Sequence, residues 1–100
     1  MKYNPSKIEK IRQLAEAEKL PFAVYALHNN KVDKIYIGQT RDLETRIVLH
    51  NTYALKGYTS RFDGEWRLVY AEFLSTRQQA LTREKELKSF RGREFVRTKL

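Results

Sequence analysis

Two polar side chains lie one helical turn apart in the segment KIYIGQTRDLETRIVLHN, residues 34–51. If the chain is helical after Thr40, His50 falls on the apolar stripe that begins at Leu43, and Arg46 lies at the edge of that stripe. A guanidinium is always charged and binds phosphate through a fork of donors, whereas an imidazole can donate, accept or relay a proton near neutral pH. The pair therefore suits phosphate chemistry, although the segment could also serve only for packing.

A carboxylate occupies an apolar position in the segment ALTREKELK, residues 80–88. On a helix, Glu84 falls about 40° from Ala80 and about 60° from Leu87, in the middle of the stripe expected to face the core. A carboxylate in such a place is costly unless it pairs with a cation or binds a metal. The pattern leaves three interpretations open: an ion pair with a nearby Arg or Lys, exposure where the helix overhangs the sheet, or a metal ligand.

Two tyrosines lie in segments that read as neighbouring strands, FAVYALH (22–28) and KIYIG (34–38). Both segments are rich in aromatic and branched residues, and the polar NNKVD between them predicts a hairpin. Residues on one face of an antiparallel pair lie about 5 Å apart, so Tyr25 and Tyr36 are expected to be neighbours. They could be core aromatics with satisfied hydroxyls or part of a chemical site.

The remaining elements complete a small α+β domain. Residues 66–74, WRLVYAEFL, alternate as a third strand, and Ser75 with Gln78 forms a capping-box start for a helix that ends near Lys88. We expect a three-stranded, mostly antiparallel sheet flanked by helices, with Asp42 or Thr40 capping the helix after the hairpin. The expected segments are an N-terminal helical extension in 1–21 with its helix over 4–19, a domain over 22–97, a loop over 52–65, a short last helix or tail after Lys88, and a final tail over 98–100.

The composition indicates a basic, cysteine-free protein. Its 100 residues suit one domain, and 20 Lys and Arg against 12 Asp and Glu give a net charge of +8. A polyanion is the expected partner, although a basic surface can also be merely solvated. Without cysteine, a membrane-spanning apolar run or a signal-peptide pattern, we expect a cytoplasmic protein with no membrane partner.

Taken together, these residues resemble the GIY-YIG nuclease superfamily. The signature reads AVY (23–25) and YIG (36–38), followed by Arg46, His50 and Glu84 at the family's positions. The resemblance runs from Phe22 to about Arg97 and is closest to small stand-alone bacterial members. Three departures stand out: Ala23-Val24 replaces Gly-Ile, no Asn follows Asn51, and Gln39 stands where some repair-type members have Lys.

The resemblance implies a phosphodiester hydrolase that uses one divalent metal, Mg²⁺ or Mn²⁺. Glu84 would be the single protein ligand, with waters and a phosphate oxygen completing the octahedron that Mg²⁺ prefers. Tyr25 or Tyr36 would accept the proton of the attacking water, His50 would relay it or orient the tyrosine, and Arg46 would stabilise charge on the phosphate.

The expected substrate is DNA, and several side chains are candidates to contact it. They are Gly38, Gln39, Lys56, Arg61, Arg67, Lys88, Arg91 and Arg93. Tyr58 and Phe62 could stack on an unpaired base, whereas Phe62 and Trp66 also suit the core. Two alternatives remain open: a catalytically silent nucleic-acid-binding module, and an adaptor that acts through its opening helix. Because the recognition surface is small, a protein partner or a homodimer could supply specificity.

Overall fold

The structure, a computed structural model, describes residues 9–10, 13, 20–52, 55 and 57–100. The predicted helix over 4–19 therefore lies outside the described residues except for positions 9, 10 and 13, and Lys56 also lies outside them. The described elements are β1 (Phe22–Asn29), β2 (Lys34–Thr40), α2 (Leu43–Asn51), the 3₁₀ turn η1 (Thr59–Arg61), β3 (Trp66–Leu74), α3 (Arg77–Lys88) and α4 (Phe90–Arg97).

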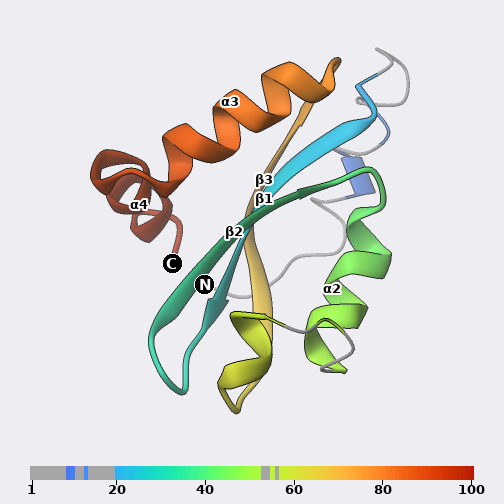
Figure 1. The fold of residues 1–100 in the computed structure, drawn as a ribbon. Coiled ribbons are helices and arrows are strands. Elements are labelled where there is room, and N and C mark those ends of the chain that lie inside the picture. The colour runs from blue at the N-terminus through green and yellow to red at the C-terminus, as the bar shows by residue number, and fades with distance from the viewer. Residues whose placement is uncertain (1–8, 11–12, 14–19, 53–54, 56) are drawn as a thin grey trace.

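The three strands form one antiparallel sheet in the order β2-β1-β3. Figure 1 shows α2 on one side of the sheet, and α3 with α4 on the other. This arrangement confirms the predicted α+β class. No helix within the described ranges is long and apolar enough to cross a membrane.

The central strand β1 is buried on both faces because a helical layer covers each of them. Its Ala23, Tyr25 and Leu27 point toward α2 and pack with Leu43 and Trp66. Successive side chains of a strand point to opposite faces, so Val24 and Ala26 pack instead against α3 and α4, where Ala80, Leu87 and Val96 complete a second core cluster. The α2 face thus contains the polar aromatic Tyr25, whereas the α3 face of β1 is apolar at Val24 and Ala26 and carries the buried His28 near its end, hydrogen-bonded to Asp33.

The helix α2 begins at a side-chain cap and buries one stripe. Asp42, one of the two predicted caps, accepts a hydrogen bond from the Thr45 backbone N–H at 3.3 Å. Leu43 and His50 are 3% exposed each, which confirms that the imidazole lies on the inward stripe.

The helix α3 begins one residue later than predicted. Its capping box uses Thr76 and Gln79 in place of Ser75 and Gln78: the Thr76 hydroxyl accepts from the Gln79 backbone, and the Gln79 amide oxygen accepts from the Thr76 backbone. Ser75 is left outside the helix, although its hydroxyl still donates to the Gln79 amide oxygen at 2.8 Å. Two adjacent hydroxyl residues followed by two glutamines offer either register to a capping box.

Candidate active site

The imidazole of His50 links three parts of the fold. A 2.9 Å hydrogen bond joins its Nε2 to the Tyr25 hydroxyl on β1, and a 2.8 Å hydrogen bond joins its Nδ1 to the Thr59 hydroxyl on η1. All three side chains belong to residues no more than 3% exposed. The ring therefore has a partner on each nitrogen and one fixed orientation.

The two tyrosines meet on the α2 face, as the hairpin pattern predicts. Their ring centroids are 6.1 Å apart, and the Tyr36 ring lies 4.8 Å from that of His50. Gly38 is the cross-strand partner of Tyr25, and a Cβ on Gly38 would lie 2.7 Å from the Tyr25 hydroxyl oxygen. The glycine of the YIG sequence thus leaves room for the tyrosine of the preceding strand.

The close contact between Gly38 and the two tyrosines explains why a glycine is needed at this position. Gly38 is a predicted DNA contact, but the position that a Cβ would take is already filled by the side chains of Tyr25 and Tyr36. Gly38 is also buried within β2. Its first structural role is therefore packing of the site, and its contact with nucleic acid stays a prediction.

Burial shifts the pKa values of the two hydrogen-bonded groups in opposite directions. The pKa of Tyr25 is raised well above its usual value, mainly because the phenol is buried and also because Tyr36 and Glu84 lie near it, while Arg46 acts against these effects. The pKa of His50 is lowered to about 4, because the ring is buried and Arg46 repels a second positive charge. Both groups are therefore neutral near pH 7.

Arg46 lies at the edge of the site, half-buried on α2. Its charge acts on both Tyr25 and His50. Within the described residues, no carboxylate forms an ion pair with its guanidinium. A partly buried cation without a counter-ion is suited to receive an anion.

Glu84 comes from α3, in the opposite layer, and its charge still acts on Tyr25. Its side chain is 19% exposed, and its Oε2 accepts from the Lys88 ammonium at 2.6 Å, one helical turn away. The ion-pair interpretation of the sequence is therefore realised, but with a half-exposed lysine on the same helix. Such a pair contributes little stability and its lysine can move away.

The chain belongs to the GIY-YIG family. The family model described as the GIY-YIG catalytic domain matches residues 21–95, which include all the residues of the site described above. The UPF0213 protein SSP2268 of Staphylococcus saprophyticus subsp. saprophyticus is 38% identical over 60 residues, which are 60% of this chain and 72% of that protein. No solved structure matches the chain significantly.

Thr59 of this GIY-YIG chain was not predicted as part of the site, and Tyr58 was predicted only as a side chain that could stack on an unpaired base. Thr59 holds His50, and its carbonyl accepts from the Trp66 indole at 3.2 Å. Tyr58, 39% exposed, stacks on Tyr36 with centroids 6.4 Å apart. Both come from the loop over 52–65, where neither strand nor helix periodicity marks an inward position. Trp66 is buried as expected, and the half-buried Phe62 packs on it.

The candidate DNA-contacting residues of this GIY-YIG chain do not lie on one element. Gln39 is half-buried in β2, and Arg61 is exposed on η1. Lys88, Arg91 and Arg93 are exposed on α3 and α4. Arg67, in β3, already pairs with Glu65 at 2.5 Å, so its charge is partly compensated.

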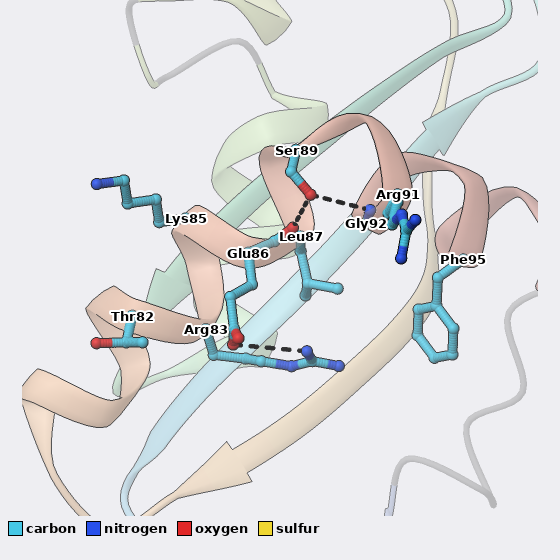
Figure 2. A pocket seen from close by; sticks show the side chains of 9 residues that line it. All are labelled: Thr82, Arg83, Lys85, Glu86, Leu87, Ser89, Arg91, Gly92 and Phe95. Atoms are coloured by element: carbon cyan, nitrogen blue, oxygen red, sulfur yellow. Dashed lines mark hydrogen bonds and ion pairs between the residues drawn. The ribbon is translucent and has the colours of Figure 1, made fainter.

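A groove between α3 and α4 lies apart from the tyrosines. Figure 2 shows its lining side chains, which include Thr82, Lys85 and Phe95, with the Arg83–Glu86 ion pair along the α3 side. On α3 most of the lining positions, 82, 83, 85 and 86, lie about 100–160° around the helix from Glu84, and Leu87 lies about 60° from it. The groove is therefore on another side of α3 from the carboxylate.

Proposed function

We propose that the protein is a divalent-metal-dependent endonuclease that hydrolyses DNA phosphodiester bonds by attack of water. The observation that carries the proposal is the convergence of Tyr25, Tyr36 and His50, with Arg46 and Glu84 near enough for their charges to act on the Tyr25 phenol. A phosphate-binding cation, proton-transfer groups and a carboxylate are the parts that phosphodiester hydrolysis requires. DNA is the proposed substrate because the net charge of +8 favours a polyanion.

In this proposal Arg46 binds the phosphate and stabilises the negative charge that develops during attack. A guanidinium supplies several donors in a fixed plane, and the lack of a competing carboxylate among the described residues leaves them available. Loss of a donor in such a role lowers the rate by about 10²–10³. Phosphate bound at Arg46 would also reduce the repulsion that lowers the pKa of His50.

Tyr25 or Tyr36 accepts the proton of the attacking water, with His50 relaying it or orienting the phenol. A phenol is a weak base near neutral pH, and burial weakens the ionisation of Tyr25 further. Arg46 is the protein group whose charge favours the phenolate form of Tyr25. The Tyr36 side chain, which is half-buried, is the more accessible of the two.

The chemistry of Glu84 fits a divalent cation that binds together with its substrate. Its side chain is partly exposed, its partner Lys88 is displaceable, and oxygen is the ligand type that Mg²⁺ and Mn²⁺ take. In the part of the chain that the structure describes, no group of three or more His, Asp or Glu could hold a metal. Waters and phosphate oxygens would therefore fill the other positions. When bound, the ion would supply Lewis-acid stabilisation of the phosphate.

The Glu84–Lys88 pair also favours a second candidate function, a catalytically silent nucleic-acid-binding module. In such a protein Lys88 would neutralise Glu84 permanently, and the basic surface would retain its affinity for DNA.

Substitution of Glu84 distinguishes the two functions. Wild-type protein with Mg²⁺ or Mn²⁺ is expected to cut plasmid or branched DNA. Glu84→Gln should reduce cleavage by at least about 100-fold, because even a residue behind a metal ligand contributes 10–100-fold, while DNA binding is retained. Glu86→Gln is the matched control, since Glu86 is exposed and its only ion pair among the described residues is with Arg83 at 3.7 Å. Absence of cleavage with either metal, with binding intact, would support the silent module.

A further inference from the structure

The Thr59 side chain is a buried hydroxyl with one hydrogen-bond partner. The residue is 2% exposed, and within the described residues its Oγ1 hydrogen-bonds only to His50 Nδ1, at 2.8 Å. Its backbone carbonyl accepts from the indole N–H of Trp66 at 3.2 Å. The Trp66 backbone in turn exchanges two hydrogen bonds with the Asn51 amide at the end of α2, at 2.8 and 2.9 Å. Thr59 is thus held in place relative to both α2 and β3.

Counting donors decides which way the Thr59–His50 hydrogen bond points. A hydroxyl has one proton to donate, and a buried donor without an acceptor is unfavourable. For Thr59 the only acceptor found among the described residues is Nδ1 of His50. If Nδ1 carried the imidazole proton instead, the Thr59 proton would have no acceptor, a penalty that disfavours this tautomer by about tenfold or more.

The same count of donors and acceptors also suits the other side chains linked to His50. With the proton on Nε2, His50 donates to the Tyr25 oxygen at 2.9 Å. The Tyr25 hydroxyl proton is then free to point toward Tyr36, whose ring centroid lies 6.1 Å from that of Tyr25. Tyr36 is only half-buried, so its own hydroxyl can extend the chain toward solvent.

We infer that Thr59 is a positioning residue whose hydroxyl donates to His50 Nδ1, fixes the imidazole proton on Nε2, and so makes His50 a hydrogen-bond donor to the Tyr25 oxygen. This inference rests on the proposed nuclease function and resolves its open choice for His50: the imidazole orients Tyr25 and stabilises its phenolate, together with Arg46, and does not act as the base. It also gives the loop over 52–65 a direct part in the chemistry.

The tautomer can be measured without any catalytic assay. Long-range ¹H–¹⁵N correlation spectra of the wild-type protein at neutral pH, without metal or DNA, should show His50 protonated at Nε2. The protein has two histidines, and the Nε2 of the other, His28, lies 2.9 Å from an Asp33 carboxylate oxygen. His28 must donate there, so it provides an internal Nε2–H reference, and His28→Gln assigns the signals. A His50 spectrum with the proton on Nδ1 overturns the inference.

Variants of Thr59 link the tautomer to activity. Thr59→Val removes the donor while keeping the shape, so the share of the Nε2–H form should fall and cleavage should drop by about tenfold. Thr59→Ser keeps the hydroxyl, so it should retain both the Nε2–H form and the wild-type cleavage rate. Thr82→Val, exposed on another side of α3, is the matched control and should change neither. Wild-type tautomer and rate in Thr59→Val would overturn the inference.

The two proposals can fail separately. If the wild-type protein cuts no DNA with either metal, the nuclease function fails while the spectrum still decides the Thr59–His50 assignment. If Thr59→Val does not fold, the wild-type and Thr59→Ser spectra remain decisive.

Discussion

The central side chains of the site are kept neutral beside Arg46, a cation that no carboxylate of the described residues pairs with. Burial raises the pKa of Tyr25 and, with Arg46, lowers that of His50. Their mutual hydrogen bond therefore joins two neutral groups, and the charge of Arg46 acts on both of them. An arriving phosphate would supply the missing negative charge, so the free site is electrostatically complementary to its proposed substrate.

The lowered pKa of His50 predicts a loss of stability in mild acid. The ring titrates at about 4 in the fold and at its ordinary value of 6.5 in the unfolded chain, so the unfolded state binds more protons between these values. The free energy of unfolding should be constant above about pH 6.5 and fall as the pH drops to about 4, by on the order of 2–3 kcal/mol. Urea unfolding across this range measures the loss.

His50→Gln is the control for this titration. The variant should be less stable at pH 7 but should lack the pH dependence that His50 contributes. The pKa values of the Asp33 and Asp63 carboxyls are lowered from their ordinary value of 3.8, so these groups affect stability mainly at and below that pH. An unchanged slope in His50→Gln would show that the imidazole is not the group responsible.

At the scale of elements, periodicity predicted the scaffold well but not the loop. The strand that contains Trp66 was predicted with its observed bounds, because alternation and aromatic content are read directly from the sequence. The start of α3 was off by one residue because Ser75 and Thr76 both suit a cap. Thr59 was missed because its inward direction depends on the indole and imidazole that it meets, not on any local pattern.

Two glycines test how the elements are held together. A Cβ on Gly38 would meet side-chain atoms of Tyr25 and Tyr36 at 2.7–2.9 Å, so Gly38→Ala should lower the free energy of unfolding by about 1–3 kcal/mol and displace the Tyr25 hydroxyl from His50.

A Cβ on Gly92, in α4, would meet the Glu86 carbonyl at 2.2 Å and the Leu87 backbone at 2.4 Å. Gly92→Ala should therefore be more destabilising than Gly38→Ala, since backbone atoms cannot rotate away from the new Cβ as side-chain atoms can.

Denaturant unfolding measures the stability of both glycine variants, and the NMR signals of the His50 ring show which of them disturbs the site. Gly38→Ala should shift the imidazole resonances strongly, because its Cβ enters the site, whereas a folded Gly92→Ala should leave them near their wild-type positions. Equal stability of Gly92→Ala and the wild type would show that α4 does not pack on α3 as closely as the structure has it.

At the scale of the whole molecule, the sheet separates two layers with different tasks. The tyrosines, His50 and Arg46 lie in the layer of α2, while Glu84 and the α3–α4 cations come from the other. The family and the α+β class were predictable because they depend on residue order and spacing. The distribution of the cations over η1, α3 and α4 was not, since it depends on how the helices turn on the sheet.

This distribution predicts which cations contribute to DNA binding. Arg91 on α4 and Arg77 at the start of α3 are both exposed, and neither forms an ion pair within the described residues. Each change to Gln lowers the net charge equally, so a purely non-specific attraction would respond equally to both. If Arg91 contacts a phosphate, Arg91→Gln should reduce the slope of log K against log salt by about 0.9, while Arg77→Gln should leave it nearly unchanged. Fluorescence anisotropy with a labelled oligonucleotide over a salt series measures both slopes. Equal slopes in the two variants would mean that Arg91 belongs to a diffuse basic surface and that the DNA path does not follow α4.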